Sequence, residues 1–298
     1  MKLAAIDIGS NAARLLISDA VLGPQGTLEF IKNALIRVPL RLGFEVFDKG
    51  EISRAKVEKI IKTLKSFSLL MDVYEVKHLK ACATSAMRDA VNADEIIKKV
   101  KTETGIEIEI ISGQDEASLI YENHFAENLA NDESYLYIDV GGGSTELTFF
   151  SDGKLIFKES FNIGTIRLLK NQVSEAQWDE MKEYIRVNAK QYHHVTAIGT
   201  GGNINKIFSL SKRKEGKPLN IDLLREYFKE FSNLSLSQRM SLYRLREDRA
   251  DVIVPALLIF LNVMRWADAE EIYVPKIGLA DGLIKKLYEE VRMSNIEI

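Results

Sequence analysis

Two segments of the chain share one pattern, in which an apolar run ends in an aspartate and continues into glycine and serine. The first spans residues 5–11 (AIDIGSN) and the second spans residues 137–145 (YIDVGGGST). The apolar run predicts a strand that ends in a carboxylate, which suits a hard cation such as Mg²⁺. The glycines let the next backbone amides approach an anion closely. Because the pattern occurs twice, about 130 residues apart, it predicts two related lobes that hold one phosphorylated ligand.

Length and composition narrow the class of protein. A chain of 298 residues is long enough for two domains, and 46% hydrophobic residues supply ample apolar surface for their cores. The net charge of −3 argues against a general nucleic-acid-binding role, although the 40 Lys and Arg residues can still cluster around a polyanion. The single cysteine, Cys82, excludes a disulfide within the chain, and we interpret it as a buried apolar residue.

The chain carries no pattern typical of secretion or of a membrane span. Its first residues do not resemble a signal peptide. Its longest apolar run, residues 252–261, contains a proline and is too short to cross a bilayer, so we interpret it as a buried helix. We therefore expect a cytoplasmic protein that does not associate with a membrane.

Strand and helix signals follow the same order in both halves of the chain. In the first half we predict strands at 3–8, 14–21, 27–38, 78–83 and 106–111, a loop at 48–50, and helices at 54–70, 92–104 and 115–129. In the second half we predict strands at 135–140, 145–151, 154–162, 195–199 and 271–274, and helices at 174–191, within 203–267 and at 279–293. Both halves thus begin with three consecutive strands.

This order predicts two domains. We expect an N-terminal lobe at residues 1–126 and a C-terminal lobe at residues 127–298. The second lobe would carry a helical insertion at about 212–245. An alternative within this division is that the last helix packs back on the first lobe.

The architecture resembles the actin/hexokinase/Hsp70 superfamily, and several segments narrow the resemblance. They are residues 83–90 (ATSAMRDA), 111–117 (ISGQDEA), 139–146 (DVGGGSTE), 164–168 (GTIRL), 249–255 (RADVIVP) and 278–284 (GLADGLI). In this order they strongly resemble the exopolyphosphatase/guanosine pentaphosphate phosphatase (Ppx/GppA) family, and the likeness runs from residue 3 to about residue 288. The resemblance implies an α/β fold with two ribonuclease H-like (actin-like ATPase) lobes and an interlobe cleft.

The resemblance also implies catalytic and metal-binding residues. Glu116 would be the general base that takes a proton from the attacking water, and its neighbour Asp115 would be a helix-start acid. Asp139 and Glu146 would hold Mg²⁺, with Mn²⁺ as the alternative metal, and Asp7 would support them from the other lobe. His193 and His194 have no acidic or cysteine partners at ligand spacing, and His78 and His124 are single.

Phosphate binding would fall to backbone amides, small polar side chains and arginines. Amides of a glycine loop can cradle a terminal phosphate, and guanidinium groups can neutralise its charge. The implied phosphate-binding residues are Ser10, Asn11, Arg41, Arg88, Gly141, Gly142, Gly143, Ser144, Arg167 and Gly201.

Three features depart from the family pattern. Ala12 stands where a small hydroxyl residue is usual, and Ala256 stands where many members have glycine. The segment at residues 42–46 (LGFEV) lacks a second glycine that is common there. The loop near Arg41 is therefore expected to differ in shape.

Several functions stay open on the sequence. The first is Mg²⁺-dependent release of terminal phosphate from inorganic polyphosphate, and the second is trimming of guanosine pentaphosphate by the same groups. A kinase or ATPase of the same superfamily and a non-catalytic polyphosphate or alarmone sensor are the alternatives of other classes. The expected partner is thus a polyphosphate or a guanosine pentaphosphate, and the resemblance makes a homodimer plausible.

Overall fold

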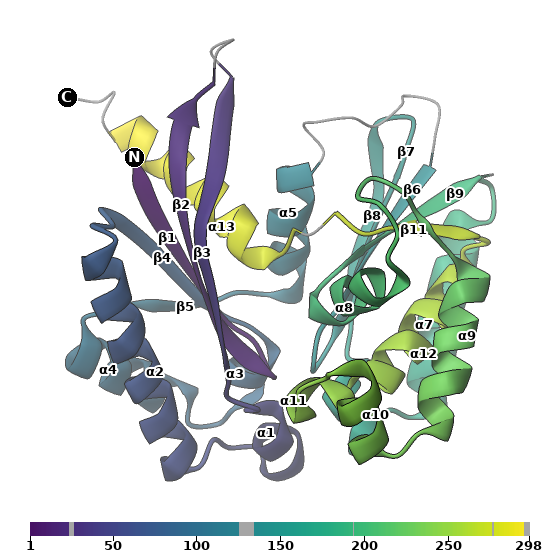
Figure 1. The fold of residues 1–298 in the computed structure, drawn as a ribbon, viewed down its shortest axis with the longest axis horizontal. Coiled ribbons are helices and arrows are strands. Elements are labelled where there is room, and N and C mark those ends of the chain that lie inside the picture. Colours follow the sequence, from purple (N-terminus) through teal and green to yellow (C-terminus); the bar gives the residue numbers. More distant parts are fainter. Residues whose placement is uncertain (24–26, 125–133, 193, 276, 295–298) are drawn as a thin grey trace. The chain divides into compact units, whose positions relative to one another are not determined.

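The computed structural model describes residues 1–23, 27–124, 134–192, 194–275 and 277–294, which form two compact units. The first unit comprises Met1–Asn123 and Gly278–Ile298, and the second comprises His124–Ile277. The boundary expected at 126/127 lies outside the described residues. The final helix, α13 (Leu279–Ser294), packs on strands of the first unit, as Figure 1 shows.

The first unit is built around a mixed five-stranded sheet in the order β3-β2-β1-β4-β5. Its strands are β1 (Lys2–Ile8), β2 (Ala12–Leu22), β3 (Leu28–Pro39), β4 (His78–Ala83) and β5 (Ile108–Ile110). The first three pair as antiparallel neighbours, whereas β1, β4 and β5 run parallel. Because the carboxyl ends of parallel strands meet at one edge of a sheet, the residues that follow β1, β4 and β5 gather there.

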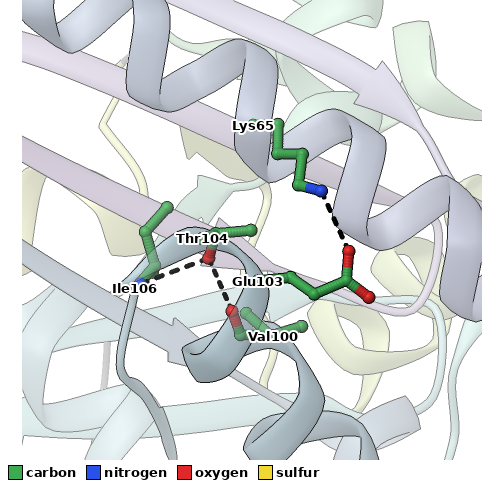
Figure 2. Close-up of polar contacts among 5 residues, drawn as sticks. All are labelled: Lys65, Val100, Glu103, Thr104 and Ile106. Carbon is green, nitrogen blue, oxygen red and sulfur yellow. Dashed lines mark hydrogen bonds and ion pairs between the residues drawn. The ribbon is translucent and has the colours of Figure 1, made fainter.

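Helices cover both faces of this sheet (Figure 1). They are α1 (Gly43–Lys49), α2 (Arg54–Val73), α3 (Ser85–Asp89), α4 (Ala93–Thr104), α5 (Gly113–His124) and α13. As predicted, the Ser53 side chain caps α2, and Gly105 ends α4 in the left-handed conformation. Near that end, Thr104 donates to the carbonyl of Val100, and Lys65 of α2 pairs with Glu103 at 2.9 Å (Figure 2).

The second unit contains a six-stranded sheet in the order β10-β11-β9-β6-β7-β8. Its strands are β6 (Ser134–Val140), β7 (Thr145–Ser151), β8 (Lys154–Phe161), β9 (Val195–Thr200), β10 (Leu219–Asn220) and β11 (Glu271–Tyr273). Five of them, read as β8-β7-β6-β9-β11, repeat the order and direction of β3-β2-β1-β4-β5. The repeat predicted from two short segments is thus confirmed at the level of strand order.

Seven helices of the second unit lie within the described residues. They are α6 (Thr165–Leu169), α7 (Glu175–Ala189), α8 (Gly202–Ser211), α9 (Ile221–Asn233), α10 (Leu236–Tyr243), α11 (Glu247–Ala250) and α12 (Ile253–Trp266). The helix predicted from the longest apolar run is α12, which lies in the core between α7, α8, α9 and β6. Within the described residues, no helix combines the length and the apolar character that a membrane crossing needs.

Some elements were predicted incorrectly. The predicted loop at 48–50 is the end of α1, and the short helices α3 and α6 follow glycine- or hydroxyl-rich turns that we had not assigned to helices. Each of the three spans two turns or fewer, so its apolar periodicity is too short to recognise. The helix predicted at 115–129 begins at Gly113, and its predicted end lies outside the described residues.

The position of α12 leads to a stability prediction for the second unit. We expect Leu257→Ala, at a site that is 1% exposed, to lower the free energy of unfolding by about 2–5 kcal/mol, because it leaves a cavity. The same substitution at Leu242, which is 66% exposed on α10, should change it by less than about 0.5 kcal/mol. The chain's two tryptophans, Trp178 and Trp266, both belong to this unit, so denaturation followed by tryptophan fluorescence reports on it. Equal effects at the two leucines would contradict the assignment of α12 to the core.

Candidate functional site

The aspartate of the first repeated segment, Asp7, is buried at the end of β1. Its side chain is 2% exposed and forms an ion pair with Arg14, the residue directly opposite it on β2. A buried carboxylate without a partner would be costly, and the ion pair with Arg14 supplies that partner. The contribution of Asp7 to a metal site stays a prediction.

The turn after β1 is held from two directions. The Ser10 hydroxyl lies 2.7 Å from that of Ser85 at the start of α3, and both side chains are buried. The carbonyl of Asn11 accepts hydrogen bonds from the amides of Leu40 and Arg41, at 3.1 and 2.8 Å. The structure thus brings three predicted phosphate-binding residues, Ser10, Asn11 and Arg41, into one local network.

Arg41 has an unusual conformation. Its backbone φ is +56°, in the left-handed region, and its guanidinium lies 4.0 Å from the centre of the Phe44 ring. A guanidinium over an aromatic face is stabilised by the ring quadrupole and keeps its N–H donors at the rim. The altered loop expected after Arg41 is the start of α1, which begins at Gly43.

Arg88, on α3, holds the connection between β5 and α5. Its Nη1 donates to the carbonyl of Ile111 at 2.9 Å, and the amide of Ile111 donates to Ala83 at 3.1 Å. A guanidinium has five N–H donors, so this bond does not exhaust its capacity to bind an anion. Arg88 therefore positions the residues just before the predicted base.

Glu116, the predicted base, lies in the first turn of α5 and is half-buried. The preceding acid, Asp115, forms the helix start, because its amide donates to the Ser112 hydroxyl, which in turn donates to its carboxylate at 2.6 Å. Burial, and next the nearby carboxylates of Asp7 and Glu116, raise the pKa of the Cys82 thiol well above its usual value. The carboxylates of Asp7 and Glu116 thus both affect the Cys82 thiol, so both lie near the same edge of the first sheet.

In the second unit, Asp139 and Glu146 face each other across the β6–β7 hairpin. Residues directly opposite in an antiparallel pair share a face of the sheet, so both carboxylates lie on one side. Glu146 is 3% exposed and accepts hydrogen bonds from the hydroxyls of Ser144 and Ser160, at 2.6 and 3.0 Å. Two oriented carboxylates are a donor set that fits a hard divalent cation.

The three glycines between these strands form a loop whose carbonyls are bound from α6. The carbonyl of Gly141 accepts from Thr165 at 3.1 Å, that of Gly142 from Ile166 at 2.8 Å, and that of Gly143 from Arg167 Nε at 2.8 Å. Gly164 makes this close contact possible, since a Cβ there would lie 2.4 Å from the Gly142 oxygen.

The glycine amides of this loop differ in their hydrogen bonds. The amide of Gly141 donates to the carbonyl of Ser144 at 2.9 Å, whereas those of Gly142 and Gly143 donate to no other group within the described part of the chain. Successive backbone N–H groups in a turn can form an anion-binding concavity. The phosphate cradle expected at Gly141, Gly142, Gly143 and Ser144 stays a prediction, and the Arg167 side chain binds a carbonyl of the loop.

The predicted glycine at position 201 lies beside Asp139. Gly201 has φ of +94°, and a Cβ there would lie 2.9 Å from Asp139 Oδ1. Thr200, opposite Asp139 in the β6–β9 pair, has a buried hydroxyl with no hydrogen-bond partner in the described structure. The turn after β9 thus brings its backbone close to the carboxylate of Asp139.

Four further polar residues belong to these two networks but were not predicted as site residues. Arg14 pairs with Asp7, Ser85 lies within hydrogen-bond distance of Ser10, and Ser160 donates to Glu146. The fourth, Arg249, lies against Gly202 and donates to Asn203 at 2.8 Å. Cross-strand register would have identified Arg14 and Ser160, which lie directly opposite their partners. Ser85 and Arg249 depend on helix positions, which no short sequence pattern specifies.

The predicted residues therefore form one group in each unit. The first unit brings together Asp7, Ser10, Asn11, Arg41, Arg88 and Glu116 around the carboxyl ends of β1, β4 and β5. The second brings together Asp139, Gly141, Gly142, Gly143, Ser144, Glu146, Arg167 and Gly201 around the β6–β7 hairpin. Each group contains carboxylates and anion-binding donors, as phosphoryl-transfer sites do.

Comparison with known proteins identifies related sequences and structures. A family model described as the Ppx/GppA phosphatase family matches residues 34–290. Exopolyphosphatase 1 of Mycobacterium tuberculosis is 26% identical over 97% of this chain and 89% of its own length. The guanosine-5'-triphosphate,3'-diphosphate pyrophosphatase of Aeromonas salmonicida is 27% identical over 94% of this chain and 58% of its own length.

Two further relatives complete the comparison. A bifunctional 3-dehydroquinate synthase/phosphatase of Fusobacterium nucleatum is 29% identical over 91% of this chain, which spans 44% of that relative's length. The crystal structure of the Aquifex aeolicus member of the Ppx/GppA family is 27% identical, with a TM-score of 0.74 over 97% of this chain and 98% of its own.

The shared architecture confirms the predicted α/β class with two actin-like lobes. The family model covers most of the chain, including every predicted site residue from Arg41 to Gly201. The chain belongs to the Ppx/GppA phosphatase family.

Proposed function

We propose that the protein is a Mg²⁺-dependent exopolyphosphatase, which releases terminal phosphate from inorganic polyphosphate. The observation that carries the proposal is the glycine loop of the second unit, whose carbonyls are bound by α6 and Arg167. The amides of Gly142 and Gly143, which have no other acceptor within the described residues, would bind a terminal phosphate beside the Asp139–Glu146 pair. The name of the mycobacterial relative, exopolyphosphatase 1, supports the choice of substrate.

The reaction would be hydrolysis of a phosphoanhydride. A water oxygen attacks the terminal phosphorus, Glu116 takes the water proton, and the bond from that phosphorus to the bridging oxygen breaks. The leaving group is the polyphosphate shortened by one unit. General-base catalysis of this kind contributes about 10²–10⁴-fold in rate. Glu116 fits the role because it is half-buried in a helix turn whose cap uses Asp115 instead.

Asp139 and Glu146 would hold the metal ion. Mg²⁺ prefers carboxylate oxygens and, when bound, would neutralise charge on the phosphate oxygens. The Ser144 and Ser160 hydroxyls both donate to Oε1 of Glu146 and so orient its carboxylate. The missing side chain of Gly201 leaves an oxygen of Asp139 uncrowded, since a Cβ there would lie 2.9 Å from Asp139 Oδ1.

Binding of the polyanion would use the arginines and the loop amides. Arg88 and Arg41 can donate to phosphate oxygens while they keep the contacts described above. Asp7, which is ion-paired with Arg14, would lie at the edge of this group and contribute to the electrostatic potential around the phosphate. The lone buried hydroxyl of Thr200 is a further donor beside Asp139.

A second substrate within the same class is guanosine pentaphosphate. It is supported by the name of the Aeromonas relative, a guanosine-5'-triphosphate,3'-diphosphate pyrophosphatase. The same base and metal ligands would remove its terminal 5'-phosphate. A substrate panel of short polyphosphate, long polyphosphate, guanosine pentaphosphate and ATP, each with Mg²⁺, separates the two. We expect the highest kcat/KM for polyphosphate; no phosphate release from any of the four would overturn the proposal.

The role of Glu116 leads to the first prediction. Glu116→Gln keeps the shape of the side chain but removes its ability to accept a proton, so phosphate release should fall about 10²–10⁴-fold. Polyphosphate affinity, measured by equilibrium binding, should change little. Asp115→Asn is the matched control, because the neighbouring Asp115 carboxylate accepts a hydrogen bond from Ser112 at the helix start, and its substitution should lower the rate only a few-fold. Full activity in Glu116→Gln would exclude it as the base.

The metal site leads to the second prediction. Glu146→Gln keeps an oxygen for the bonds from Ser144 and Ser160 but loses the charge, so the Mg²⁺ concentration for half-maximal activity should rise more than about tenfold. Titrations with Mg²⁺ and with Mn²⁺ measure this shift. Asp152→Asn, in the β7–β8 turn where Asn also tolerates positive φ, is the control. An unchanged metal requirement in Glu146→Gln would remove this residue from the metal site.

A further inference from the structure

Gly282 brings two helices of the first unit into backbone contact. It lies on α13, and a Cβ at this position would lie 2.0 Å from the carbonyl oxygen of Leu119 on α5 and 2.6 Å from its carbonyl carbon. Contacts this short do not occur, and the atoms involved belong to the backbone of a helix. Any side chain at position 282 would therefore force one of the two helices to move.

The position of α13 is fixed at several points. The Asp281 carboxylate accepts a hydrogen bond from the amide of Gly278 at 2.9 Å and pairs with Lys32 of β3 at 2.5 Å. Further along α13, Glu290 pairs with Lys80 of β4 at 2.7 Å. The helix also packs an apolar face on β1, β2 and β4. A clash at position 282 would therefore displace α5 more readily than α13.

Helix α5 carries the proposed base. Glu116 lies three residues before Leu119, within one turn of the same helix. A shift of α5 at Leu119 is thus transmitted to Glu116. Proton transfer depends on placement within hydrogen-bond reach, and a misplacement of about 1 Å can cost about 10²-fold in rate.

We propose that Gly282 is a positioning residue, whose missing side chain lets α5 seat against α13 with Glu116 aligned for proton transfer. The proposal rests on the proposed role of Glu116 as the base. It assigns Gly282 no contact with substrate or metal; its effect is exerted through the backbone contact with Leu119 alone. Substitution should therefore lower kcat and leave substrate binding nearly unchanged.

The test compares two Gly→Ala substitutions at the start of the same helix. We expect Gly282→Ala to lower kcat for polyphosphate about 10–100-fold, with KM and the Mg²⁺ requirement within a few-fold of wild type. Gly278→Ala is the matched control, because nothing lies within 4 Å of a Cβ at that position and its amide bond to Asp281 is kept. Wild-type kcat in Gly282→Ala would overturn the proposal.

A double-mutant cycle separates alignment of Glu116 from a general structural effect. In the Glu116→Gln background, Gly282→Ala should cause little further loss of the residual rate, because no base remains to be misplaced. An undiminished loss in that background would contradict the proposal. If Glu116→Gln itself keeps full activity, the proposed function is contradicted. If Glu116→Gln is slow but Gly282→Ala keeps the wild-type kcat, only the positioning role of Gly282 is contradicted.

A rescue variant covers the case in which Gly282→Ala does not fold. Lys32→Met removes the ion pair that fixes Asp281, so α13 can yield in place of α5. In the Gly282→Ala, Lys32→Met pair we expect folding, checked by circular dichroism, and a higher kcat than in Gly282→Ala alone. A pair that is equally unfolded or equally slow would contradict the proposal, since relief of the contact would then have no effect on Glu116.

Discussion

Carboxylates buried at the ends of central strands are the constraint on which both sites depend. Removing a carboxylate from water costs several kcal/mol unless charge or hydrogen bonds compensate. In the first unit an arginine on the neighbouring strand pairs with Asp7. In the second unit two hydroxyls orient Glu146. These different solutions make the two halves of the repeat chemically unequal, although their sheets share one strand order.

The glycine loop depends on this constraint in turn. Its three carbonyls are bound by α6 and by the Arg167 side chain, and the same loop connects the two carboxylate-bearing strands. A carboxylate pair and the unbonded amides of Gly142 and Gly143 therefore lie on one hairpin of the described structure. Such a combination suits the phosphate oxygens and the metal ion that accompany phosphoryl transfer. The family resemblance assigns the base to a different element, α5, so in the proposed function the attack by water would depend on how that helix packs.

Much of the fold could be predicted because its signals are local. The strands at β1, β6 and β7 and the buried helix α12 were recognised from apolar runs, and their bounds differ from the prediction by a few residues at most. The helices α1, α3 and α6 were missed because each is too short to show a period. The division of the chain also depends on α13, which follows the second unit in sequence but packs on β1.

The sequence indicated residues that gather in each unit but not every contact that they make. Arg88 and Arg167, predicted to bind phosphate, donate to the backbone carbonyls of Ile111 and Gly143, and their phosphate contacts stay predictions. No spacing along the chain indicates which atom a long side chain will reach. The register opposite Asp7 and Glu146 would have indicated Arg14 and Ser160, because cross-strand neighbours follow from a hairpin alignment.

In the proposed reaction, water attacks the terminal phosphorus while Glu116 accepts its proton. Hydrolysis of polyphosphate in ¹⁸O-enriched water tests it directly, with the released phosphate analysed by mass spectrometry. We expect one oxygen from the solvent in each phosphate released, and the labelled product should form far more slowly in Glu116→Gln. Release of phosphate without solvent oxygen, or only when an acceptor such as a nucleotide or a sugar is present, would contradict it.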